Sequence, residues 1–284
     1  MSKYFLFFWL FLVGGLSGGN AQEMLDPNYW ESMDLIPPLN KEFIKKKGIQ
    51  AIHFEIRKKK PDERLEFSET LDYSFDWEGN LVEVISFNSD GETKNQFIFE
   101  DGLFKIKTTI RNGTETRVVH VFDNYGRTIE LQYFRRKVGE VVPSAPFKTE
   151  KIIRHLIHGG KTTEEKIVNH FGVQQKSTTV YKDNKARPVE QVIRTPGKNT
   201  TIYWARNEKG QLHLWKRKSN YLLWEFKLSY RHNKLDAIIG TRGRKQESIY
   251  FQYEGAIPGA VSSILRTNMQ TKIMEVVQVD YTTF

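Results

Sequence analysis

The stretch YSFDWEGNL, residues 73–81, decides the expected fold. Tyr73 and Phe75 alternate with polar residues, which is the period of a strand that buries one face. Asp76 and Gly79 then occupy the first and fourth positions of a type I turn. At these positions a carboxylate can accept from backbone amides, and glycine can adopt the left-handed conformation. Because apolar residues resume at Leu81, the stretch predicts a β-hairpin.

Looser copies of this hairpin recur along the chain. Similar turns follow one another at intervals of roughly 22 to 33 residues, with return turns about midway between them. Two strands in each interval predict an all-β fold, an antiparallel meander of repeated β-hairpins over residues 49–284, as an extended or curled sheet. The aromatic content of 13% favours strands. The widest interval leaves open a sub-boundary near residues 140–160.

The N-terminal part divides into two predicted segments. Residues 1–21 carry one lysine, an apolar block and small residues before Ala21, which is typical of a signal peptide. Residues 22–48 form an irregular lead-in and a short helix over 41–47, with Asn40 as N-cap and Gly48 at its end. We therefore expect an exported protein, periplasmic or extracellular, without a transmembrane segment after cleavage.

Composition excludes several chemistries. The chain has no cysteine, so disulfides, cysteine nucleophiles and thiolate metal sites are ruled out. Its net charge of +9 suits anionic surroundings, although a solvated surface of mixed charge gives the same value. Nothing indicates a specific nucleic-acid partner, and the oligomeric state stays open.

The repeated turn resembles the YD-repeat of RHS-type proteins, which combines aromatic residues, an aspartate, two spacers, a glycine and a hydrophobe. The matching residues are Tyr73, Phe75, Asp76, Gly79 and Leu81, and then Val121, Phe122, Asp123, Gly126 and Ile129. The resemblance implies a spiralling β-sheet scaffold over about residues 70–280. The core and toxin domains of long RHS proteins have no counterpart in this chain.

Residues 203–224 interleave aromatic and basic side chains and give the candidate ligand-binding set. Such residues can stack sugars and neutralise anionic groups. The candidates are Trp215, Arg217, His213, Tyr203 and Arg206. A protein core with a solvated rim explains the same residues, and alternation places only His213, Trp215 and Arg217 on one face.

Metal and catalytic sites are not expected. His155 and His158, with His170 further on, are interpreted as surface or turn histidines, because a metal needs three or more converging ligands. No nucleophile or nucleotide-binding motif occurs, and we expect no cofactor. The C-terminal Phe284 resembles the terminal aromatic of outer-membrane barrels. Counting back from it in steps of two gives Thr282, Asp280 and Gln278, which are too polar to face lipid, so that interpretation is rejected.

Three functions follow from these patterns. The first is a non-enzymatic scaffold or binding protein of the cell envelope that contacts an anionic glycan, a lipid headgroup or a protein. The second is a carrier of an amphiphile, either a lipid or a lipoprotein, on an apolar concave face. The third, a glycan hydrolase, requires a pocket with converging carboxylates or histidines.

Overall fold

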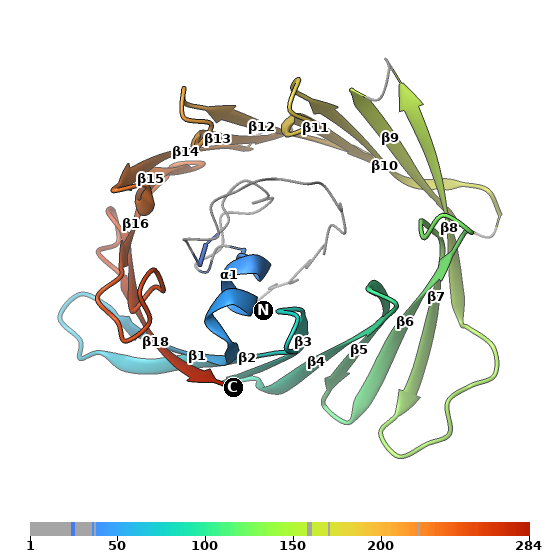
Figure 1. The fold of residues 1–284 in the computed structure, drawn as a ribbon, viewed down its shortest axis with the longest axis horizontal. Helices are drawn as coiled ribbons and strands as arrows, with labels where there is room; N and C mark the ends of the chain where they lie inside the picture. The colour runs from blue at the N-terminus through green and yellow to red at the C-terminus, as the bar shows by residue number, and fades with distance from the viewer. Residues whose placement is uncertain (1–23, 26–35, 37, 158–160, 170, 221) are drawn as a thin grey trace.

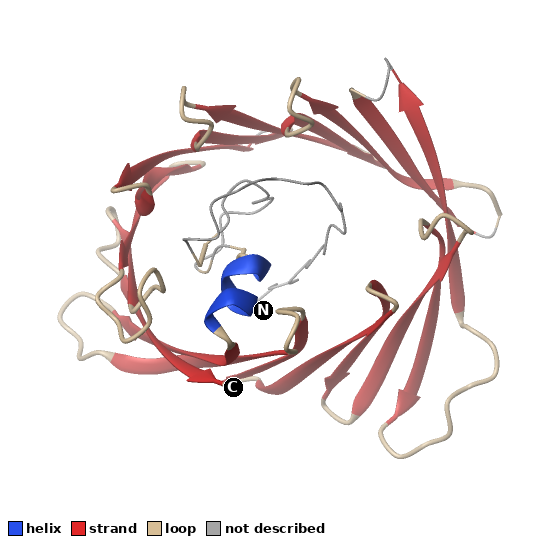
Figure 2. Cartoon of the chain, in the orientation of Figure 1, coloured by secondary structure: helices blue, strands red, loops and turns tan. Residues whose placement is uncertain are grey.

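The structure is a computed structural model that describes residues 24–25, 36, 38–157, 161–169, 171–220 and 222–284. The predicted signal peptide, His158 and His170 lie outside these residues. One short helix and eighteen strands make up the fold (Figures 1 and 2). Their bounds are α1 Lys41–Lys47, β1 Ile49–Lys59, β2 Glu66–Phe75, β3 Leu81–Asn88, β4 Gly91–Glu100, β5 Leu103–Arg111, β6 Thr114–Phe122, β7 Thr128–Lys137, β8 Lys148–Ile157, β9 Thr162–Asn169, β10 Gln174–Lys182, β11 Pro188–Thr195, β12 Lys198–Arg206, β13 Leu212–Ser219, β14 Leu222–Arg231, β15 Lys234–Arg242, β16 Lys245–Gln252, β17 Ser263–Asn268 and β18 Met274–Thr283.

The strands form a closed antiparallel β-barrel. Each strand pairs with its neighbours in the chain, and β1 pairs with both β2 and β18. In the closing pair, Phe54 lies opposite Val279 and Ile56 lies opposite Val277. The ribbon therefore returns to its starting point as a ring (Figure 1).

Closure corrects two predictions. The antiparallel meander and the N-terminal helix are confirmed, but the expected extended or curled sheet is wrong because the sheet closes after eighteen strands. The resemblance to the YD-repeat of RHS-type proteins is wrong for the same reason. Here the repeats make a single circuit, and the pairing of β18 with β1 leaves no edge from which a spiral could continue.

The recurring turn has the predicted geometry. The amides of Glu78 and Asn80 donate to Asp76 Oδ1 at 3.0 and 2.8 Å, and Gly79 has a φ of +79°. The same pair of backbone hydrogen bonds closes the turns that begin at Asp76, Asp123, Asn169, Asp183 and Asn207. The side-chain acceptor and the left-handed fourth residue thus define a hairpin unit that the chain uses repeatedly.

The pairing register assigns each strand residue to the inner or the outer face of the wall. Inward-facing residues such as Ile52 and Tyr73 lie opposite each other and belong to the buried cluster. On the outer face, His53 Nδ1 lies 2.5 Å from Asp72 Oδ1. Other ion pairs on the outer face are Lys94–Glu83, Arg136–Glu115 and Lys216–Glu225, at 2.6, 2.7 and 2.9 Å.

Helix α1 packs inside the ring against β1 (Figure 1). Asn40 Oδ1 accepts from the amides of Glu42 and Phe43, and Gly48 ends the helix with a φ of +59°. Phe43 and Ile44 are fully buried. Both predicted caps are confirmed, and the apolar side of the helix contributes to the barrel core.

Residues 24 and 25 tie the start of the described chain to its end. Met24 is fully buried, and its Sδ lies 2.9 Å from the hydroxyl of Tyr281 on β18. The Tyr281 hydroxyl also donates to the Val261 carbonyl. Burial raises the pKa of Tyr281, because an ionised phenol would lose its hydration here.

The connections between strands alternate between two ends of the barrel. Those that follow even-numbered strands lie at the end where the residue 76–80 turn meets α1, which we call the helix end. Those that follow odd-numbered strands lie at the opposite end, which we call the distal end.

Within the described residues, no helix is long and apolar enough to cross a membrane.

Candidate functional site on the inner wall

The buried cluster occupies only part of the barrel interior. It includes α1, Met24 and Leu25 and inward side chains of β1–β5 and β12–β18, but no described residue of β6–β10. In Figure 1, β5–β9 lie on the side of the ring away from α1. An eighteen-stranded barrel is too wide for wall side chains alone to fill. The inward face of β6–β10 is therefore the first place to look for a site.

One hydrogen-bonded row of residues crosses this wall. Along the row, Phe97 on β4 lies opposite Lys107 on β5, then Val118, Tyr133 and Lys148 follow on β6, β7 and β8. Residues opposite one another in a ladder share a face of the sheet. Because Phe97 belongs to the buried cluster, the whole row faces inward.

Lys107 has an unusual environment for a charged side chain. Its Nζ lies 5.9 Å from the centre of the Phe97 ring, and none of the described carboxylates forms an ion pair with it. Burial lowers the pKa of Lys107 below its ordinary value. An anion beside this ammonium would replace the hydration that the wall removes.

Tyr133, Lys148 and Glu150 form a linked polar group that begins two strands away from Lys107 along the row. The Tyr133 hydroxyl donates to Glu150 Oε2 at 2.7 Å, and Lys148 Nζ lies 2.6 Å from Glu150 Oε1. Burial, and then the hydrogen bond to Glu150, raise the pKa of Tyr133. Glu150 is nearly buried, so this group holds its charges in fixed places on the wall.

An aromatic floor lies next to this polar row, towards the helix end. The ring of Phe104 contacts Phe97, Phe99 and His120 at centroid distances of 6.0, 5.5 and 4.7 Å. Burial lowers the pKa of His120 from 6.5 to about 4, so its imidazole is neutral at pH 7. The wall thus combines an apolar surface with a cation and offers complementary chemistry to an anionic amphiphile.

The inner wall also carries a charge network near β1 and β14–β18, on the side that contains α1. Glu247 is almost fully buried and accepts from Arg266 at 2.8 Å, while Arg266 also contacts Glu275 at 3.2 Å. Lys58 lies 3.4 Å from Glu275. Glu247 and Glu275 each face a cation, so their ion pairs have the character of a structural element.

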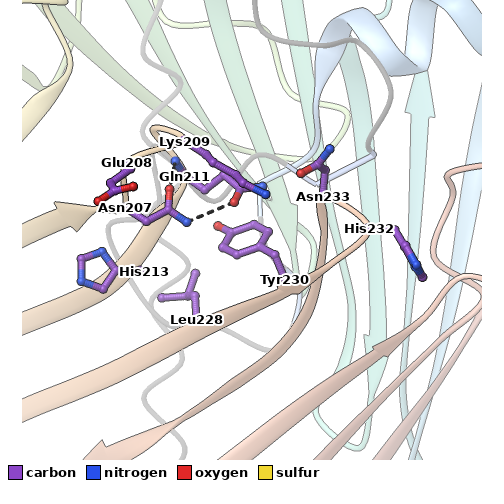
Figure 3. Close-up of a pocket in the computed structure, with 9 residues that line it drawn as sticks. All are labelled: Asn207, Glu208, Lys209, Gln211, His213, Leu228, Tyr230, His232 and Asn233. Carbon is purple, nitrogen blue, oxygen red and sulfur yellow. Dashed lines mark hydrogen bonds between the residues drawn. The ribbon is translucent and has the colours of Figure 1, made fainter.

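A separate hollow of about 770 Å³ opens between the residue 207–211 turn and β14 and its following turn (Figure 3). Its polar groups hold the turn itself, since Asn207 Nδ2 donates to Gln211 Oε1 and Tyr230 donates to the Leu212 carbonyl. His213 and His232 lie on opposite sides of it (Figure 3). No group of histidines and carboxylates among the described residues could hold a metal ion.

The five residues predicted from the sequence do not form one surface. Trp215 is fully buried and packs on Phe226, while the Arg217 guanidinium lies 5.1 Å from the Trp224 ring. Tyr203 is on the outer face. The remaining two lie near the helix end, where His213 borders the hollow and Arg206 donates to the Pro188 carbonyl at 2.7 Å.

Sequence reasoning missed Lys107 for a physical reason. Strict alternation places Phe104 and Ile106 inward and Lys105 and Lys107 outward. A bulge opposite Phe99 instead lets both Phe104 and Lys107 face the interior. Only the observed strand pairing, in which Lys107 lies opposite the inward-facing Phe97, shows that Lys107 faces the interior.

Comparisons with known proteins assign no family. No protein-family model matches the chain, and no curated protein matches it. Among solved structures it is similar to a porin-like protein from Bacteroides uniformis, with a TM-score of 0.40 and 8% identity over 83% of this chain and 97% of that one. A porin-like protein from Bacteroides vulgatus gives a TM-score of 0.35 and 11% identity over 81% and 98%. The LolA superfamily protein NE2245 from Nitrosomonas europaea gives 0.22 and 8% over 86% and 92%. TM-scores this low support no functional argument.

Proposed function

We propose that the protein is an exported, non-catalytic carrier that holds an anionic amphiphile against the inner wall of its barrel. The environment of Lys107 carries the proposal. Its ammonium group is half-buried, faces the barrel interior beside the aromatic floor, and forms no ion pair with any of the described carboxylates. A phosphate or carboxylate headgroup would lie at Lys107, and its hydrocarbon chain would lie along Phe99 and Val118, neighbouring apolar side chains that remain half-exposed.

The closed fold favours a carrier over the scaffold that the sequence placed first. A closed sheet leaves no free strand edge to present to a partner, whereas it encloses an interior that wall side chains cannot fill. The ion pairs of the outer face support a barrel surrounded by water, because a lipid-facing barrel needs an apolar outer band.

Binding of two lysolipids with the same acyl chain tests the proposal. We expect the purified chain without residues 1–21 to bind lysophosphatidylglycerol more tightly than lysophosphatidylcholine, as measured by native mass spectrometry or titration calorimetry. Lys107→Gln should weaken binding of the anionic lipid on the order of tenfold, because one charge-assisted hydrogen bond is lost, and leave the zwitterionic lipid nearly unchanged.

The matched control is Lys216→Gln, which removes a lysine from the outer face where it pairs with Glu225. It should leave both affinities unchanged. An equal effect of the two substitutions, or no binding of either lipid, would reject the carrier. Thermal unfolding of both variants shows that the fold is retained.

A further inference from the structure

A second surface, independent of the inner wall, lies at the distal end of the barrel. Nine connections meet there because the strands alternate in direction, and the longest of them spans residues 138–147. We propose that this end docks on the surface of a bilayer that contains anionic phospholipid.

Exposed apolar side chains gather at this end. About half of the large apolar residues that are exposed in the described chain lie in the distal connections or beside them. Val141 is 90% exposed, and Leu222 is 56% exposed. Others are Phe67, Val138, Phe147 and Met269. The number of these side chains at one end of the barrel makes the distal end a candidate interaction surface.

Basic side chains surround these apolar residues. Within two positions of the distal connections, exposed bases among the described residues are twice as numerous as exposed acids. Examples of the bases are Lys59, Lys137, Lys198 and Lys272. Within the same margin of the described connections at the helix end, five exposed bases stand against four exposed acids, and α1 adds Lys41, Lys45 and Lys46 against Glu42. The distal end therefore has the larger excess of positive charge, which complements an anionic surface.

The arrangement fits a bilayer better than a protein partner. The apolar residues come from connections on separate sides of the ring, after β1, β7, β13 and β17 (Figure 1). One partner protein would have to span the whole ring to cover them. A planar membrane contacts all of these connections at once, with apolar groups in the interface and lysines at the level of the phosphates.

Vesicle sedimentation of the mature chain tests this docking. We expect binding to vesicles of phosphatidylcholine with phosphatidylglycerol at low salt, and little binding to phosphatidylcholine alone. The double variant Lys198→Gln/Lys272→Gln should lose about fivefold in partitioning for each lysine. Val141→Glu/Leu222→Glu should lose at least tenfold.

Variants of the helix end are the matched controls. Lys185→Gln/Lys209→Gln and Trp77→Glu/Tyr125→Glu alter residues that are equally exposed at the other end, and should change partitioning less than twofold. No binding to anionic vesicles, or equal losses from both ends, would overturn the proposal. Lys107→Gln should not affect sedimentation, which separates docking from uptake of lipid into the barrel.

Discussion

The carbonyl oxygen of Lys41 lies 2.6 Å from the position that a Cβ atom on Gly79 would occupy. The turn of residues 76–80 and the start of α1 are therefore in direct contact, and only glycine permits this approach. Gly79 serves two purposes, since its φ of +79° also closes the turn.

Replacement of Gly79 separates these two purposes. Gly126 has the same place in its turn, with a φ of +72°, but only the Leu103 side chain lies near it, at 3.5 Å. We expect Gly126→Ala to cost about 1 kcal/mol in the free energy of unfolding, from the left-handed backbone alone. Gly79→Ala should cost at least about 2 kcal/mol more, because α1 must shift. Urea unfolding measures both, and equal losses would show that α1 yields freely.

Ala186 occupies the position that glycine holds in the turns after Asp76, Asp123 and Asn207, and it has a φ of +59°. We expect Ala186→Gly to stabilise the protein by about 0.5–1 kcal/mol, because the left-handed strain exceeds the entropic cost of glycine. Ala145→Gly, in an exposed connection without positive φ, should be neutral or slightly destabilising. A loss of thermal stability in Ala186→Gly would contradict the prediction.

His120 makes stability depend on pH. Its pKa is lowered by burial from 6.5 to about 4, so between these values the unfolded chain binds a proton that the folded chain does not. Stability should therefore decrease as the pH falls from 6.5 to about 4, by about 1–2 kcal/mol for this group after allowance for its partial exposure.

The substitution His120→Gln isolates this contribution. The difference in urea midpoint between the native chain and the variant should be smaller at pH 5 than at pH 7.5. An NMR titration of the imidazole reports the same pKa directly, and a value near 6.5 would refute the assignment.

Glu247 and Glu225 provide a comparison of inner and outer ion pairs. Glu247 is buried and accepts from Arg266, whereas Glu225 pairs with Lys216 on the outer face. Glu247→Ala should cost about 3–5 kcal/mol, because it leaves guanidinium charge buried without one of its partners. Glu225→Ala should cost less than about 1 kcal/mol. Similar losses for the two variants would mean that the inner network is well hydrated.

Much of the local structure follows from the sequence. The Asp76 and Gly79 turn and the helix between Asn40 and Gly48 appear as predicted, because each depends on side chains that bond to their own neighbouring backbone. The polar outer face of the last strand was also readable, since Asp280 lies opposite His53 in the closing pair.

The candidate site was less accessible to sequence reasoning. The aromatic and basic residues of 203–224 attract attention, yet Tyr203 and Trp215 lie on opposite faces. Lys107 looks like an ordinary solvated lysine until the bulge beside Phe104 turns it inward. A bulge reverses alternation without any composition that marks it beforehand.

The sequence by itself determined the hairpin unit, its repetition and the short capped helix, because these depend on contacts within a few residues. Only the tertiary structure decided that β18 returns to β1, and therefore which side chains face an enclosed interior. An open meander and a closed barrel share the same period of two. The choice between them depends on hydrogen bonds between residues more than two hundred positions apart, which no local pattern encodes.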